Sequence, residues 1–228
     1  MRKKIIGFLY SKPYFSWIIP LFHFFIGHSK IKNKSHNIFS PTNSNIYNDR
    51  IYFKGINNCV SIGESTDLTN SYITIKGNNN RVIIGKAAFI NGINIIIEGN
   101  DCSVIIGDCA FVLDNTRVWV VDGSSLQIGV GCMFSDNIDI RTTDNHSIID
   151  IEINKRINPE ENIIIGDNVW IGTGVTVLKG VEIPEWCIVG AKSVITRKHK
   201  IPHAIIVGNP GKEVKNNVKW TMERNSNY

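Results

Sequence analysis

Residues Ile163–Ile195 read IIIGDNVWIGTGVTVLKGVEIPEWCIVGAKSVI, and an aliphatic residue recurs in this stretch at every sixth position. A smaller residue stands four positions after each of the first five of these aliphatic residues. A helix repeats its faces every 3.6 residues and a strand every two, so neither gives this pattern. The pattern is typical of a solenoid of short strands joined by tight corners. The repeating positions are Ile165, Ile171, Val177, Ile183, Val189 and Ile195, and the smaller residues are Val169, Val175, Val181, Cys187 and Ser193.

The repeat continues upstream in longer units. Gly63, Gly85, Gly107 and Gly129 are 22 residues apart, so each unit holds three six-residue repeats and four extra residues. The extra residues are expected at corners, in the Asn-, Asp- and Gly-rich stretches 77–80, 99–101 and 122–125, because these residue types tolerate positive φ. An evenly spaced β-sandwich is the alternative, but sandwiches do not hold a constant interval. The repeating aliphatic and aromatic positions are Ile84, Ile90, Ile96, Ile106, Val112, Val118, Ile128, Phe134 and Ile140.

The length and composition agree with one all-β solenoid domain. The chain has 228 residues, 43% of them hydrophobic, and isoleucine and valine dominate, as buried parallel strands require. We predict a solenoid over residues 51–200, an N-terminal apolar, helical segment and linker over 1–50, and a basic C-terminal tail over 201–228. The five cysteines contain no CxxC pair, which favours free, buried thiols.

The N-terminal segment carries an apolar run after Arg2, Lys3 and Lys4. Lys12, Pro13, Pro20 and His23 interrupt the run, and its uncharged part is too short to span a bilayer comfortably. We expect one or two short helices over residues 1–30. They could pack on the solenoid or on a neighbouring subunit, and peripheral contact with a membrane is the alternative. A cytoplasmic protein, or one at the inner face of the membrane, fits these features.

The stretch 163–195, followed by Ile201-Pro202 and by residues 208–212 (GNPGK), resembles the hexapeptide-repeat acyltransferase family. Upstream, residues 141–150 (RTTDNHSIID) resemble the active-site segment of the sugar O-acetyltransferases in that family. Galactoside-acetyltransferase-like enzymes and the polysialic acid or capsule O-acetyltransferases are the nearest resemblances, over about residues 55–215. The resemblance implies a left-handed parallel β-helix of triangular section and a homotrimer. Spacing alone does not give the handedness.

His146 is the candidate general base. A hydroxyl that attacks a thioester must lose a proton, and histidine accepts one near neutral pH. Five of the six histidines lie outside the repeats, and His146 lies where the 22-residue interval fails: the next position would be Asp150, but the repeat resumes at Ile165. Solenoids place functional residues at such interruptions. A histidine that only caps a corner is the structural alternative.

The remaining site residues follow from the resemblance. It implies that Trp170 lines the acetyl-donor thioester and acceptor site, and that the pantetheine arm of coenzyme A passes Thr173 and Ala191, which are 18 residues apart. Cations would meet the anionic end of coenzyme A. An ordinary surface charge is the alternative for each of them, and the role of Lys192 stays open. The further residues assigned to coenzyme A are Lys192, Thr196, Arg197, Lys212 and Lys215.

The sequence carries no metal-ligand cluster, no phosphate-binding loop and no nucleic-acid motif. The resemblance, together with His146, predicts an acetyl-CoA-dependent O-acetyltransferase that acts on a sugar hydroxyl of a bacterial capsular or sialic acid-type polysaccharide or an O-antigen. Two alternatives remain. One is an N-acetyltransferase of an amino sugar on the same fold, and the other is a non-catalytic, glycan-binding β-helix.

Overall fold

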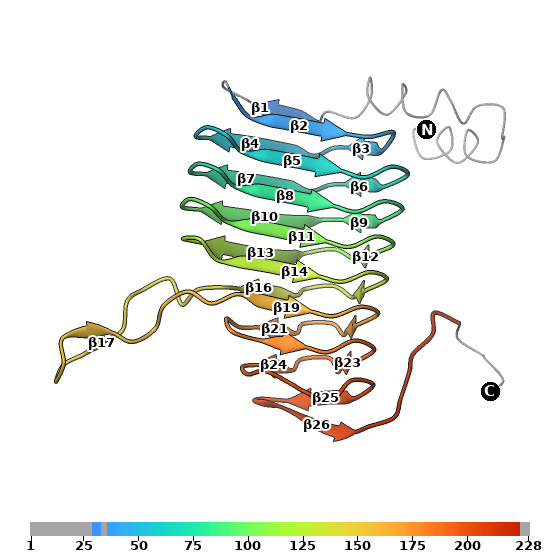
Figure 1. Cartoon of the computed structure of the whole chain (residues 1–228). Coiled ribbons are helices and arrows are strands. Elements are labelled where there is room, and N and C mark those ends of the chain that lie inside the picture. Colours follow the sequence, from blue (N-terminus) through green and yellow to red (C-terminus); the bar gives the residue numbers. More distant parts are fainter. Residues whose placement is uncertain (1–28, 33–35, 224–228) are drawn as a thin grey trace.

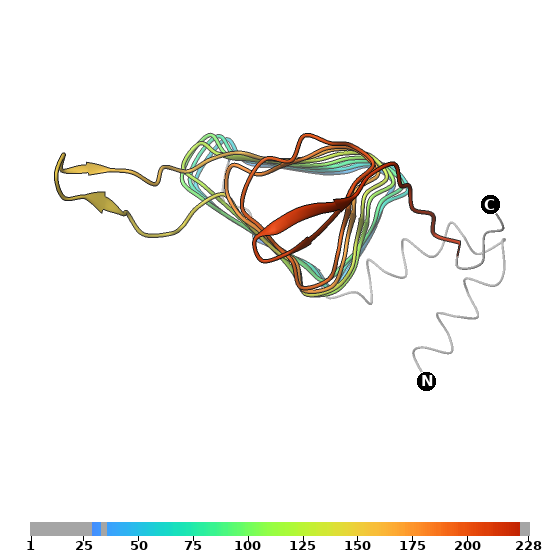
Figure 2. The same cartoon turned by 90° about the horizontal axis from the view of Figure 1, so that it is seen from below.

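A computed structural model describes residues 29–32 and 36–223, which form a stack of triangular coils (Figures 1 and 2). Each side of the triangle is one sheet, whose strands run parallel except for the last pair of the third sheet. Sheet A has eight strands in the order β1 (Lys30–Lys32), β4 (Arg50–Lys54), β7 (Tyr72–Lys76), β10 (Ile93–Glu98), β13 (Thr116–Val121), β16 (Asp139–Arg141), β21 (Thr176–Val177) and β24 (Val194–Ile195). Sheet B has seven, in the order β2 (Ile38–Pro41), β5 (Cys59–Ile62), β8 (Arg81–Ile84), β11 (Ser103–Ile106), β14 (Ser125–Ile128), β19 (Ile163–Ile165) and β22 (Glu182–Ile183).

Sheet C closes the triangle with nine strands. The strands of sheet A lie behind those of sheet B and point to the left, and the chain descends from coil to coil (Figure 1). This path is a left-handed helix. The left-handed parallel β-helix is therefore confirmed. The order in sheet C is β3 (Asn45–Tyr47), β6 (Asp67–Thr69), β9 (Phe89–Asn91), β12 (Phe111–Val112), β15 (Met133–Phe134), β20 (Trp170–Ile171), β23 (Ile188–Val189), β25 (Ile205–Gly208) and β26 (Gly211–Lys215).

The strand register reproduces the repeat of the sequence. Ile62, Ile84, Ile106 and Ile128 pair in turn through sheet B, each 22 residues after the last. Ile128 then pairs directly with Ile165, so the break in the repeat is an insertion that leaves the stack intact. The stretches 77–80, 99–101 and 122–125 join strands of sheet A to strands of sheet B, which confirms that the extra residues form a corner.

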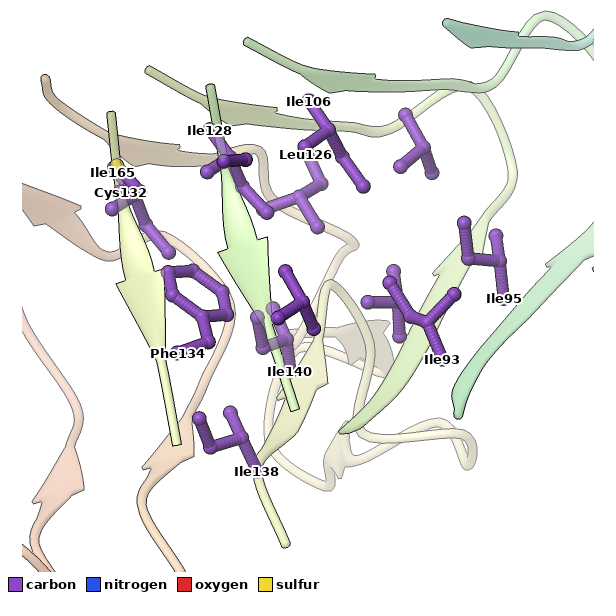
Figure 3. Close-up of a cluster of buried hydrophobic side chains, with 14 of the residues drawn as sticks. Ile93, Ile95, Ile106, Leu126, Ile128, Cys132, Phe134, Ile138, Ile140 and Ile165 are labelled. Atoms are coloured by element: carbon purple, nitrogen blue, oxygen red, sulfur yellow. The ribbon is translucent and has the colours of Figure 1, made fainter. Parts of the chain in front are cut away.

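The repeating side chains fill the interior of the prism. Phe134 is completely buried and lies among the isoleucines of neighbouring coils (Figure 3). One assignment is wrong: Ile96 points outward and pairs with Trp119, whereas Ile95 and Ile97 are the buried residues of that strand. The cause is the corner between sheets C and A before β10, which is one residue shorter than the same corner in the next coil. The strand register shows this, because one residue more separates Ile95 from its partner Val118 than separates Ile73 from its partner Ile95.

Asparagine side chains tie the coils together at the corner between sheets A and B. The buried Asn80 donates from its amide to Oδ1 of Asn58 and to the carbonyl oxygen of Gly99, both at 3.0 Å. Asn58 repeats the arrangement one coil earlier, with Asn37 and Gly77. Each buried amide is therefore satisfied by the coils beside it, as burial of a polar group requires.

The strand pairing extends beyond the limits expected for the solenoid. Among the described residues it runs from β1, residue 30, to the antiparallel pair β25–β26, residue 215, and Ile206 of β25 and the preceding Ala204 are buried. The division at residues 50 and 200 stays a prediction. The helices expected for residues 1–30, and membrane contact through them, fall almost wholly outside the described residues. No helix within 29–32 and 36–223 has the length and apolar character to cross a bilayer.

Candidate active site

A hairpin arm, residues 142–162, leaves the corner between sheets A and B. It contains the antiparallel strands β17 (Ile149–Asp150) and β18 (Lys155–Arg156) and projects well away from the prism (Figures 1 and 2). Its side chains are unusually apolar for a projecting element: Ile151 is 92% exposed, and four other isoleucines of the arm are also exposed. Exposed apolar side chains gathered on one element are typical of a contact surface. The other four are Ile148, Ile149, Ile153 and Ile157.

His146 lies at the base of this arm and is exposed to solvent. The amide of the buried Asn158 donates to the backbone oxygen of His146 at 2.9 Å, and Oδ1 of Asn158 accepts from the backbone N–H of Ile148 at 2.7 Å. The imidazole Nε2 lies 3.1 Å from the side-chain nitrogen of Asn145. Asn158 therefore fixes the backbone that carries His146 while the ring stays accessible.

A carboxylate anchors the same loop to the next coil. Asp144 accepts from Asn158 at 2.9 Å and forms an ion pair with Lys179 at 2.6 Å. The hydrogen bond from Lys179 is the main cause of a lowered pKa of Asp144, and that from Asn158 adds to it. Asp144 is therefore ionised at neutral pH and holds the loop of His146 against the corner at Lys179.

Trp170 lies in β20 on the outer face of sheet C, between Met133 and Ile188. The C-terminal segment crosses it: the ring of Trp220 lies 6.2 Å from that of Trp170, and the Trp220 N–H donates to the backbone oxygen of Asn168 at 2.6 Å. The Trp170 N–H is buried and has no hydrogen-bond partner within residues 29–32 and 36–223. A buried N–H without a partner is costly, so this donor is available to a ligand.

Three polar residues and Ala191 stack at the corner between sheets C and A. Thr173 donates from its hydroxyl to Asp136 at 2.7 Å, and its backbone oxygen accepts from the N–H of Lys192 at 2.9 Å. The bond from Thr173 is the main cause of a lowered pKa of Asp136. Ala191, one coil below Gly172, is exposed beside them. The structure therefore brings Thr173, Ala191 and Lys192 together, at the corner that follows Trp170.

The other cations predicted to meet coenzyme A lie near the C-terminal end of the stack. Arg197 faces Glu213 at 4.0 Å, and the buried His199 approaches Glu213 at 2.6 Å. Burial raises the pKa of Glu213. The hydrogen bond to His199 and the charge of Arg197 both lower this pKa, and the net shift is downward. Arg197 is therefore partly neutralised, whereas Lys212 and Lys215, on β26, and Thr196 are exposed.

One chain does not bring His146 and Trp170 together. His146 stands at the corner between sheets A and B, and Trp170 on sheet C, the side of the triangle opposite that corner. In Figure 2 the arm and the C-terminal segment, which packs on Trp170, leave the prism in opposite directions. The two residues assigned to one reaction therefore lie on different faces of the molecule.

Several residues of these clusters could not be found by sequence reasoning. Asp136, Asn158, Lys179 and Trp220 each act on a residue 12 to 50 positions away, and no motif signals the pairing. Within 29–32 and 36–223, no group of three or more His, Cys, Asp or Glu side chains could hold a metal ion. All five cysteines are free thiols; Cys102, Cys132 and Cys187 are buried, but Cys109 is exposed.

Comparison with known proteins gives a consistent picture. The family described as "Bacterial transferase hexapeptide (six repeats)" matches residues 162–197. A polysialic acid O-acetyltransferase of Escherichia coli O1:K1 / APEC is 33% identical over 102 residues, 44% of this chain and 33% of that protein. One from Neisseria meningitidis is 36% identical over 108 residues, 47% of this chain and 50% of that protein.

A solved structure extends the similarity to almost the whole chain. The polysialic acid O-acetyltransferase OatWY superimposes with a TM-score of 0.81 and 32% sequence identity, over 86% of this chain and 92% of that one. In sequence alone, the chain aligns with one third to one half of the length of the two curated relatives above. The likeness in fold therefore reaches further than the likeness in sequence.

Proposed function

Because the chain belongs to the family of hexapeptide-repeat acetyltransferases, we propose that it transfers an acetyl group from acetyl-coenzyme A to a hydroxyl of an acidic bacterial polysaccharide. A capsular or sialic acid-containing polymer, or an O-antigen, is the acceptor. The observation that carries this proposal is the 32% identity over 92% of a solved polysialic acid O-acetyltransferase. The exposed histidine at the base of the arm supplies the group that such a transfer needs.

His146 is the general base in this proposal. Its neutral imidazole accepts the proton of the sugar hydroxyl while the hydroxyl oxygen bonds to the acetyl carbonyl carbon. His146 then gives that proton to the sulfur as the carbon–sulfur bond breaks, which yields the acetyl ester and free coenzyme A. Asn158 and the Asp144–Lys179 pair support this role, because they hold the loop of His146 in place without covering its ring.

Trp170 and the corner below it hold the acetyl donor. The unpartnered Trp170 N–H can donate to a carbonyl oxygen of the bound donor, and Thr173, Ala191 and Lys192 line the path of the pantetheine arm. Thr196 and the cations Arg197, Lys212 and Lys215 lie near its phosphates. Charge-assisted hydrogen bonds from lysine and arginine are the usual means of binding phosphates.

The site is shared between two copies of the chain in a homotrimer. The arm carries His146 away from its own sheet C, so His146 can meet Trp170 only in a neighbouring copy. The exposed isoleucines of the arm support this arrangement, since contact with a second copy would remove them from water.

The decisive experiment measures free thiol released from acetyl-coenzyme A in the presence of polysialic acid. His146→Ala should lower the rate about 10²–10⁴-fold, the usual contribution of a general base. His36→Asn, at an exposed turn near the other end of the stack, should leave the rate unchanged and serves as the matched control. An unaltered thermal unfolding midpoint of His146→Ala would show that the fold is intact.

The outcomes separate the alternatives. A His146→Ala variant with near-normal thiol release would contradict the proposed base. Acetylation of an amino sugar in preference to every hydroxyl acceptor would favour the N-acetyltransferase. Calorimetry without any heat of binding for coenzyme A would favour a non-catalytic glycan-binding β-helix.

A further inference from the structure

The outer face of sheet A differs in charge from that of sheet B. At the outward positions of sheet B, register-paired strands present mainly small or aliphatic side chains, such as Ser61, Ile83 and Ile105. On sheet A the corresponding positions carry lysine, arginine and aromatic residues in vertical columns. Stacked parallel strands lie about 4.8 Å apart, so one column presents its side chains at short, regular intervals.

The first column of sheet A carries three cations, two neutral side chains and one carboxylate. The guanidinium of Arg50 lies over the ring of Tyr72, 5.4 Å from its centroid, which leaves Tyr72 44% exposed. Arginine held over a tyrosine ring keeps its charge and presents a flat surface. From β1 to β16 this column contains Lys30, Arg50, Tyr72, Asn94, Arg117 and Asp139.

The second column, directly beside the first, adds two aromatic residues. Tyr52 is 40% exposed, and the half-buried Trp119 has a buried indole N–H without a hydrogen-bond partner among the described residues. Flat aromatic faces stack on sugar rings. From β1 to β16 this column contains Lys32, Tyr52, Thr74, Ile96, Trp119 and Arg141.

Two arginines surround the carboxylate of Asp139 on the last strand before the arm. Arg117 donates to both oxygens of Asp139 at 2.9 Å, and Arg141 donates from Nε to the same carboxylate at 2.7 Å. Two guanidinium groups share one carboxylate, so a net positive charge remains. The chain leaves sheet A directly after Arg141 and reaches His146 five residues later.

We propose that the outer face of sheet A binds the acidic polysaccharide acceptor as an extended chain and leads it to the arm that carries His146. The carboxylates of the polymer meet the lysine and arginine side chains, and its sugar rings lie on Tyr52, Tyr72 and Trp119. From β1 to β16 the face is about 24 Å long, enough for several sugar residues. This inference rests on the proposed function, because it concerns the acceptor of that reaction.

Direct binding tests this inference without any acetyl donor. The full-length protein is titrated into end-labelled polysialic acid, and binding is followed by fluorescence anisotropy. Arg50→Gln/Lys54→Gln removes two exposed charges from sheet A and should weaken binding about tenfold at low salt, with a smaller salt dependence. Arg81→Gln/Lys86→Gln removes one arginine and one lysine outside sheet A and should change binding less than about twofold.

The results that would overturn this inference are distinct from those that would overturn the acetyl transfer. Equal loss of binding in both double variants, equal binding of neutral dextran, or tighter binding of single-stranded DNA would each contradict it. With acetyl-coenzyme A present, Arg50→Gln/Lys54→Gln should raise KM for the polymer about tenfold and leave kcat unchanged. Intact polymer binding without any transfer would contradict only the proposed function, and transfer with an unaltered KM would contradict only the role of sheet A.

Discussion

Asp49 is a buried carboxyl group at the corner between sheets C and A. It is 1% exposed, its Oδ1 accepts from the backbone N–H of Ser71 at 2.7 Å, and its Oδ2 has no partner in the part of the chain that the structure describes. Burial raises the pKa of Asp49 to about 7, against the smaller opposing effect of its hydrogen bonds. In the folded protein the group therefore binds a proton that the unfolded chain releases at a much lower pH.

This difference predicts that the protein loses stability as the pH rises. Between about pH 4 and pH 7 the folded state holds one more proton than the unfolded state, so the free energy of unfolding should fall by about 2–4 kcal/mol. Asp49→Asn keeps the acceptor for Ser71 and cannot ionise, so most of this fall should disappear. Urea unfolding at about pH 4 and about pH 8 measures the effect.

Asp101→Asn, at an exposed corner position, is the matched control and should behave like the unaltered protein. A steep loss of stability with rising pH that persists in Asp49→Asn would show that another group causes it.

Among the elements, the corner between sheets A and B depends on glycine. Gly77 has a φ of +129°, and a Cβ added there would lie 1.7 Å from the carbonyl oxygen of Gly99 in the next coil. The corners can stack at the spacing of the strands only because no side chain separates them. This close approach, together with the backbone conformation, excludes any other residue.

Gly77→Ala should therefore destabilise the protein by about 3 kcal/mol or more, because both strain and a clash with the next coil arise. Gly123→Ala is the matched comparison: Gly123 has a φ of +77°, but a Cβ added there would have no other atom within 4 Å. That variant should lose only about 1–2 kcal/mol from backbone strain. Equal losses in the two variants, measured by urea unfolding, would contradict the role of close stacking.

For the whole molecule, the separation of His146 from Trp170 can be tested by mixing inactive chains. His146→Ala and Trp170→Ala should each be inactive alone. Refolded together in equal amounts, they should regain about a quarter of the activity, because one site in four then combines an intact His146 with an intact Trp170 from a neighbour. Mixing the two variants without unfolding them is the control, and it should restore nothing if the trimer does not exchange subunits.

No recovery after joint refolding would show that both residues act within one chain, and would contradict the shared site.

Much of the fold could be predicted because it depends on a local pattern. The positions from Ile165 to Ile195 are all buried, and the residues between them form the strands and corners that the spacing indicates. The prediction that Ile96 is buried was wrong, because a corner shortened by one residue exchanges the inward and outward positions of the strand that follows it. The break in the repeat coincides with the insertion that carries His146, but its projecting hairpin was not predicted.

The local sequence pattern therefore suffices for the parallel β-helix, its coil length and the place where the arm interrupts it. Burial of two residues in every six produces a pattern that is visible in each short segment of the chain. Tertiary contacts alone establish that Trp220 covers Trp170, that Lys179 holds the loop of His146, and that sheet A presents a basic, aromatic face. These contacts join residues that lie in different coils or at positions open to solvent. At such positions the hydrophobic effect imposes no periodic pattern on the sequence.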